Sequence, residues 1–184
     1  MKINRKASRT FEKFFEMRSS LIHQFAEGEI TKRQFLEYNH DLVRRTHIKP
    51  FLRIDSYEMG MYNYQYYNVL AKYYNMLANE VKNTRKHARY YNYYYNKGNN
   101  YYNEKDKATL NLLEFLEFEG VEAYFINVNS KSLQNELYEI VLLNYDEAIF
   151  HSKSIRLLDV LKKKKVFKKG FKDSLIDGYI NEEY

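Results

Sequence analysis

The stretch that decides the fold runs from Tyr57 to Tyr102 and reads YEMGMYNYQYYNVLAKYYNMLANEVKNTRKHARYYNYYYNKGNNYY. It holds 14 of the chain's 20 tyrosines and none of its 12 phenylalanines, which lie at Phe11–Phe51 and Phe115–Phe171. A tyrosine ring buries like a phenylalanine ring, but its hydroxyl group needs water or a hydrogen-bond partner. The stretch therefore predicts helices with an aromatic core, whose outer rings are exposed to solvent or contact a partner.

Apolar residues in the first half of this stretch follow helical periodicity along two neighbouring stripes. One stripe contains Tyr62, Tyr66, Leu70, Tyr73, Leu77 and Val81, and the other contains Tyr67, Ala71, Tyr74 and Ala78. Because this arc is wider than one amphipathic face, we expect a central helix with neighbours on two sides. A second tyrosine-rich helix is expected at about 86–97, and Gly98 then marks either a break or a point of close packing.

The segment before this stretch predicts a helical hairpin over residues 8–46. Gly28 is a natural left-handed end of the first helix, and Thr31 with Gln34 has the spacing of a capping box. Residues 11–45 resemble the two-helix SHOCT module, through Leu21, Phe25, Gly28, Ile30, Thr31, Phe35 and Leu42. That resemblance implies oligomerisation or attachment to other domains, and no chemistry.

Beyond Gly120 the pattern changes to the alternation typical of strands, at 121–128 and again at 146–152. Residues 137–144 fit a strand or a helix, and the strand is favoured because residues 144–146 make a compact turn. Helices are expected at about 154–165 and 172–182. The predicted fold is α+β and helix-dominated, with an N-terminal helical body, a small C-terminal antiparallel sheet of two or three strands, and terminal helices. We expect one domain over 1–184, with sub-elements 8–46, 55–119 and 121–184.

Two further resemblances concern longer parts of the chain. Residues 87–118 resemble a tetratricopeptide helix pair, through Tyr94, Gly98, Tyr101, Ala108 and Leu112, although no second copy follows at the expected period. Nearly the whole chain resembles an uncharacterised family of clostridial-type, low-GC Gram-positive proteins, known only as a domain of unknown function. The segments that carry this likeness are 63–78 (NYQYYNVLAKYYNMLA), 148–154 (AIFHSKS) and 174–181 (SLIDGYIN). The resemblance implies no activity, substrate or catalytic residue.

Composition and charge narrow the function classes. The absence of cysteine excludes disulfides, thiolate nucleophiles and cysteine-ligated metals. The longest aliphatic run, Ile140–Leu143, is far shorter than the roughly 20 residues of a membrane helix, so we expect a soluble cytoplasmic protein without membrane contact. The net charge of +6 divides into +9 over residues 1–103, −6 over 104–160 and +3 over 161–184. The positively and negatively charged regions can neutralise one another, within one chain or between copies. The basic pI is therefore weak evidence for nucleic-acid binding.

Residues typical of catalytic or metal sites are few. Glu37 and His40 have the spacing used in di-metal helical bundles, but no second such pair exists, so no metal is predicted. His151, followed by Ser152 and Lys153, resembles part of the phospholipase D signature, although Asp159 lies one residue too far. An enzyme with a pocket near His151 is the third function hypothesis. No cofactor is predicted, because no glycine-rich phosphate loop or nucleophile elbow is present.

The leading hypothesis is a non-enzymatic protein–protein interaction or oligomerisation module that binds a protein partner or a second copy of itself. Tyrosine suits interfaces because its ring buries much area at a small cost in side-chain entropy. The expected partner-binding residues are Tyr91, Tyr94, Tyr95 and Tyr101, with Arg85 and Arg89 at the rim. The alternative is nucleic-acid binding, with tyrosine rings of Arg85–Tyr102 stacked on bases. It would also use a basic patch of Lys162, Lys163, Lys164, Lys165, Lys168 and Lys169.

Overall fold

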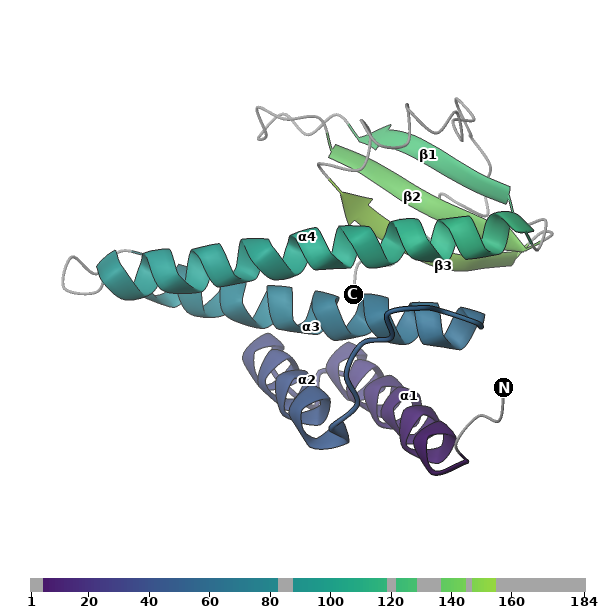
Figure 1. The fold of residues 1–184 in the computed structure, drawn as a ribbon. Coiled ribbons are helices and arrows are strands. Elements are labelled where there is room, and N and C mark those ends of the chain that lie inside the picture. The colour runs from purple at the N-terminus through teal and green to yellow at the C-terminus, as the bar shows by residue number, and fades with distance from the viewer. Residues whose placement is uncertain (1–4, 83–87, 119–121, 129–136, 145–146, 155–184) are drawn as a thin grey trace. The chain divides into compact units, whose positions relative to one another are not determined.

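The computed structural model describes residues 5–82, 88–118, 122–128, 137–144 and 147–154. Four helices come first in the chain: α1 (Arg5–Ala26), α2 (Lys32–Thr46), α3 (Tyr57–Val81) and α4 (Ala88–Phe118). Three strands follow, namely β1 (Glu122–Val128), β2 (Leu137–Asn144) and β3 (Glu147–Ser154), as Figure 1 shows. The helical body predicted for the N-terminal part is confirmed. None of the helices in these ranges has the length and apolar character needed to cross a membrane.

The link between α1 and α2 is built by local signals. Gly28 has a φ of 74°, in the left-handed region that favours glycine. Thr31 Oγ1 accepts a hydrogen bond from Gln34 N at 3.2 Å, and Gln34 Oε1 accepts one from Thr31 N at 2.9 Å. The predicted capping box is therefore confirmed, and it sets the start of α2 by satisfying two backbone donors that the helix leaves open.

The core between α1, α2 and α3 is centred on Tyr62. Its ring is fully buried and lies 4.9 Å from the ring of Phe14, centroid to centroid. Its hydroxyl group donates to the backbone oxygen of Ile48 at 2.8 Å, so burial leaves no unsatisfied donor. The other buried members of this cluster are Leu42, Val43, Val69 and Leu70. Tyrosine can thus act as a core residue when the loop after α2 supplies an acceptor.

The loop after α2 is also held by the buried amide of Asn63. Asn63 Oδ1 accepts from Phe51 N at 2.7 Å, and Asn63 Nδ2 donates to Phe51 O at 2.8 Å. Both backbone groups of Phe51 are therefore paired without any sheet or helix partner. The side chain of Asn63 fixes the path of the loop against α3.

Helix α4 is continuous from Ala88 to Phe118, so the tetratricopeptide-like helix pair expected over 87–118 is wrong. Gly98 lies inside the helix, where an added Cβ atom would meet Asn75 N at 3.4 Å and Ala71 O at 3.5 Å. The glycine marks the close packing of α4 on α3 rather than a break. Helix α3 consequently has neighbours on two sides, with α1 and α2 on one and the first half of α4 on the other (Figure 1).

The chain divides into two compact units. One holds α1, α2, most of α3 and α4 up to Lys105, and the other holds the rest of α4 and the strands. The strands pair antiparallel in the order β1-β2-β3, with an irregularity in register between Leu142 and Leu143. Residues 137–144, which fit a strand or a helix by sequence, form β2. The single domain stays a prediction, and the turn at 145–146 and the helices expected beyond 154 lie outside the described residues.

Candidate interaction surface

A row of stacked rings connects α2, α3 and α4. His40 of α2 stacks on Tyr73 of α3, with ring centroids 3.8 Å apart and planes inclined by 13°. The neighbouring Tyr74 of α3 stacks with two rings of α4. Its ring centroid lies 6.4 Å from that of Tyr94 and 5.7 Å from that of Tyr101. Such offset stacks contribute beyond the area they bury. Many tyrosines of the middle helices therefore serve to pack one helix on the next.

Burial shifts the pKa of three ionisable side chains in this row in the direction that favours their neutral forms. It lowers the pKa of His40, and it raises the pKa of Tyr73 and of Tyr101. The nearby Asp41 works in the opposite direction on His40, but burial is the larger effect. At neutral pH His40, Tyr73 and Tyr101 are therefore predominantly uncharged.

The ammonium group of Lys97 packs against the rings of this row. Its Nζ atom lies 4.4 Å from the centroid of the Tyr74 ring and 5.3 Å from that of the Tyr93 ring. It also donates a hydrogen bond to Tyr93 Oη at 3.1 Å, and hydrogen bonds to Tyr74 and Tyr93 raise the pKa of Lys97. Because Lys97 binds both rings, it holds the exposed Tyr93 in one position.

The first half of α4 presents a surface rich in tyrosine. The exposed fractions are 55% for Tyr90, 55% for Tyr93 and 46% for Tyr95. Tyr91 is half-buried and stacks on Tyr95 at 5.6 Å and 17°. These residues lie on both sides of the stripe that packs on α3, since Tyr93 and Tyr95 are only two residues apart in a helix. We call Arg89, Tyr90, Tyr91, Tyr93 and Tyr95 together the tyrosine face of α4. Several large exposed rings along one helix are typical of a contact surface.

The structure separates the expected partner-binding residues into two groups. Tyr95 and Arg89 are exposed and Tyr91 half-buried, all on the tyrosine face. Tyr94 and Tyr101 are half-buried because they stack on Tyr74, so they lie beneath this face. Arg85 and the basic patch at Lys162–Lys165, Lys168 and Lys169 lie outside the described residues.

Two residues of the tyrosine face were not predicted from the sequence as partner-binding residues. Tyr90 and Tyr93 are the most exposed of its rings, yet neither was expected at the partner surface. Tyr93 falls outside the helical stripe of Tyr94, Gly98 and Tyr101 that packs on α3, whereas Tyr90, four residues before Tyr94, is in line with that stripe. Helical spacing measured from Gly98 would therefore have found Tyr93 but not Tyr90.

Glu37 and His40, the residues considered for metal binding, do not form a metal site in the described part of the chain. Glu37 Oε1 binds Arg33 Nε at 2.9 Å, whereas His40 packs on Tyr73. Among the described residues, no three histidine or acidic side chains are close enough to share a metal ion. His151 lies in β3, in register with Val141 of β2. Its catalytic role stays a prediction, because the structure describes only the backbone there.

No curated protein and no solved structure matches this sequence. One family model matches residues 4–184, which is nearly the whole chain. The expected resemblance to a family of unknown function is confirmed, whereas the clostridial-type lineage and the SHOCT likeness stay predictions. The chain belongs to DUF6648, a family of unknown function.

Proposed function

We propose that this chain is a helix-dominated α+β protein acting as a non-enzymatic protein–protein interaction or oligomerisation module, with the tyrosine face of α4 as its binding surface. A cytoplasmic location belongs to the same proposal. The observation that carries it is the exposure of Tyr90, Tyr93 and Tyr95 beside rings already packed between helices.

The contact of α4 with α3 is made chiefly by Tyr94, Gly98 and Tyr101. Tyr74 is already covered by Tyr94 and Tyr101, and Gly98 brings the α4 backbone against α3. A partner that covered the tyrosine face would remove apolar ring area from water, at about 25 cal/mol per Å². The hydroxyl groups could keep their bonds to water at the edge of such an interface.

The tyrosine face is also partly ordered before any partner binds. Lys97 holds Tyr93, and Tyr91 and Tyr95 stack on each other. Rings that are already held lose less conformational freedom on binding, so more of the contact energy remains as affinity. Rigid tyrosines are the usual anchors of antibody binding sites for this reason.

The charge of this segment favours a protein partner over nucleic acid. Between Ala88 and Asn103 the only charged residues are Arg89 and Lys97, and Lys97 is engaged by two rings. The remaining polar residues are mostly asparagines, at 92, 96, 99, 100 and 103. Nucleic-acid affinity depends on several cations contacting phosphates, whereas tyrosine with asparagine is typical of protein-binding surfaces.

Nucleic-acid binding remains the second candidate, carried by the position of exposed Arg89 beside the exposed Tyr90. Rings next to a cation can stack on single-stranded bases. Fluorescence anisotropy with labelled single-stranded oligonucleotides would support this candidate if affinity fell steeply as salt increased. No binding at low salt would remove it.

The main test is multi-angle light scattering of the full chain over a range of concentrations. The native chain should form oligomers that the triple variant Tyr90→Ser, Tyr93→Ser, Tyr95→Ser does not form. Tyr38→Ser, which changes an exposed tyrosine of α2, is the matched control and should behave as the native chain. The proposal fails if the native chain is a monomer throughout and, when immobilised, retains the same proteins as the triple variant.

A further inference from the structure

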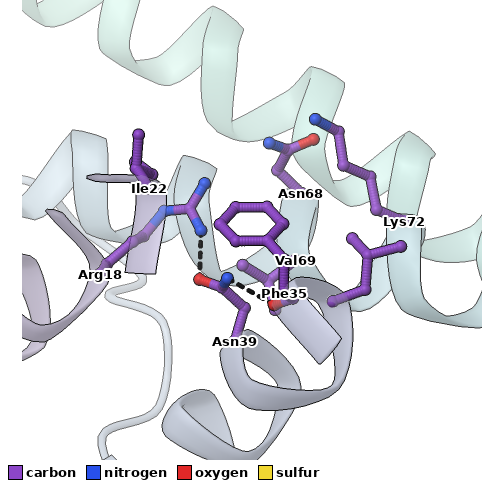
Figure 2. A pocket seen from close by; sticks show the side chains of 8 residues that line it. Arg18, Ile22, Phe35, Asn39, Asn68, Val69 and Lys72 are labelled. Carbon is purple, nitrogen blue, oxygen red and sulfur yellow. Dashed lines mark hydrogen bonds between the residues drawn. The ribbon is translucent and has the colours of Figure 1, made fainter. Parts of the chain in front are cut away.

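A pocket lies where α1, α2 and α3 meet, away from the tyrosine face. Its volume is about 40 Å³, and its polar lining comes from Arg18, Asn39, Asn68 and Lys72. Phe35 and Val69 supply apolar lining (Figure 2). Pockets for whole metabolites measure roughly 300–1,000 Å³, so this one suits a single chemical group.

Arg18 brings a buried positive charge to the pocket. The residue is 9% exposed, its Nε donates to Gln65 Oε1 at 3.0 Å, and a terminal nitrogen donates to Asn39 Oδ1. Asn39 is held in turn by a bond from its Nδ2 to Phe35 O at 2.7 Å. Both acceptors are neutral amide oxygens, and within the described residues no carboxylate forms an ion pair with Arg18.

In the part of the chain that the structure describes, this arrangement leaves the positive charge of Arg18 without a counter-charge and some of its N–H donors without acceptors. A guanidinium carries five N–H groups, of which these two bonds use two. Burial lowers the pKa of Arg18 to about 10, which still leaves the group protonated at neutral pH. Burying a charge without a counter-charge is costly, so an anion that reached the free donors would stabilise the folded chain.

A second polar group in the pocket is independent of Arg18. Asn68 is 9% exposed and lines the pocket, and its side chain makes no hydrogen bond within the described part of the chain. The amide atoms of Asn68 are not among the fully buried side-chain atoms left without a partner, so they are open to the pocket and can reach a ligand there. Lys72, one helical turn further along α3, adds positive charge to the same wall. Figure 2 shows Asn68 and Lys72 together on α3, with one terminal nitrogen of Arg18 turned away from Asn39.

We propose that this pocket binds one compact oxyanion group, a carboxylate or a phosphate, through the Arg18 guanidinium and the Asn68 amide, with Lys72 adding positive charge to the wall. The planar guanidinium matches the spacing of carboxylate and phosphate oxygens, and charge-assisted hydrogen bonds of this kind are strong. The amide of Asn68 supplies a neutral donor, while Phe35 and Val69 limit the space to the anionic head. The remainder of a larger ligand would lie in solvent.

The test is an NMR titration of the full-length, isotope-labelled chain with sodium phosphate and, separately, with sodium acetate. Chloride keeps the ionic strength constant. The Arg18 Nε–H and Asn68 side-chain signals should shift in a saturable way with at least one anion. Saturation by phosphate alone identifies a phosphate ligand, and saturation by acetate alone identifies a carboxylate ligand.

Variants separate this site from general salt effects. Arg18→Met and Asn68→Leu should each weaken the saturable binding roughly tenfold or more, because each removes a donor from a buried site. Arg33→Met, at an exposed arginine of α2, is the matched control and should bind as the native chain does. Asn68→Leu removes no charge and nearly conserves volume, so it tests the proposal even if Arg18→Met does not fold. No saturable shift with either anion, or unchanged affinity in Asn68→Leu, would overturn it.

Discussion

Lys97 of α4 holds its ammonium group 4.4 Å from the centre of the Tyr74 ring of α3, so a cation closes the aromatic contact between the two helices. The same group donates to Tyr93 Oη at 3.1 Å. One side chain thus joins the packed row of rings to the tyrosine face. Changes at Lys97 should therefore affect both the stability of the helical unit and the order of its surface.

Replacing Lys97 by methionine should lower the free energy of unfolding by about 1 kcal/mol, because the cation–π contact and the bond to Tyr93 are lost while the aliphatic stem remains. Lys97→Arg should retain most of this stability, since arginine also interacts with ring faces. Urea unfolding followed by circular dichroism measures both. Equal stability of Lys97→Met and the native chain would contradict this account.

Gly98 should tolerate alanine but not a large side chain. An alanine Cβ would sit at ordinary contact distance from the α3 backbone, 3.4 Å from Asn75 N, and alanine favours helices by up to about 1 kcal/mol over glycine. Gly98→Ala should therefore be neutral or stabilising. Gly98→Leu should cost roughly 1–3 kcal/mol, since its further atoms would meet that backbone.

Thermal unfolding of both glycine variants checks this expectation. Asn100→Leu, at an exposed position two residues along α4, is the control for adding leucine to the helix, and it should change stability by no more than about 0.5 kcal/mol. If Gly98→Leu were as stable as Asn100→Leu, the close approach of α4 to α3 would be refuted.

Tyr62 should show separate contributions from its hydroxyl group and its ring. Tyr62→Phe leaves the Ile48 carbonyl without its 2.8 Å donor and should cost about 1–2 kcal/mol. Tyr62→Ala should cost about 3–5 kcal/mol, because the fully buried ring contacts Phe14 and leaves a cavity. Chemical denaturation measures both, with Tyr38→Phe on the exposed surface of α2 as the control. Identical effects of Tyr62→Phe and Tyr38→Phe would show that the buried hydroxyl bond contributes nothing.

His40 should make the protein less stable as the solution becomes acidic. Burial, and to a smaller degree the charges of Arg44 and Lys97, lower its pKa below the value of 6.5 that it has when exposed. Below that value the unfolded chain binds a proton more readily than the folded chain, so stability rises with pH there. The contribution of His40 is complete above about pH 6.5 and is lost as pH falls toward the lowered pKa of the folded state.

The measurement compares urea midpoints at about pH 7.5 and about pH 5 for the native chain and His40→Phe. The variant keeps a ring against Tyr73 but cannot titrate, so its midpoint should fall less on acidification. Other groups titrate in both proteins and cancel in the difference. An equal fall in both proteins would show that His40 does not couple folding to pH.

The beginning of α2 and the central position of α3 could be predicted because their signals are local. Thr31 and Gln34 form the capping box expected from their spacing, and Gly28 adopts the left-handed conformation. The wide apolar arc of α3 predicted neighbours on two sides, which α1, α2 and α4 supply. Each signal operates within a few turns of helix.

The candidate sites were less predictable, because the tyrosines of α4 are chemically identical and differ in exposure only through the residues that pack against them. Tyr94 is covered by Tyr74 while the adjacent Tyr93 and Tyr95 are exposed. Arg18, Asn39 and Asn68 lie far apart in the sequence and match no motif, so nothing there indicated a common pocket.

The sequence by itself determined where α1 ends and α2 begins, and that the middle of the chain carries more tyrosine than an ordinary core. Those properties follow from capping, left-handed glycine and helical periodicity, which depend on neighbouring residues. Only the tertiary structure decided that α4 passes Gly98 without a break, which rings α3 covers, and that a buried arginine meets an unpaired amide between three helices. These outcomes depend on which helices cross and where they cross. A contact between two distant segments produces no residue pattern within either segment, so the sequence does not reveal it.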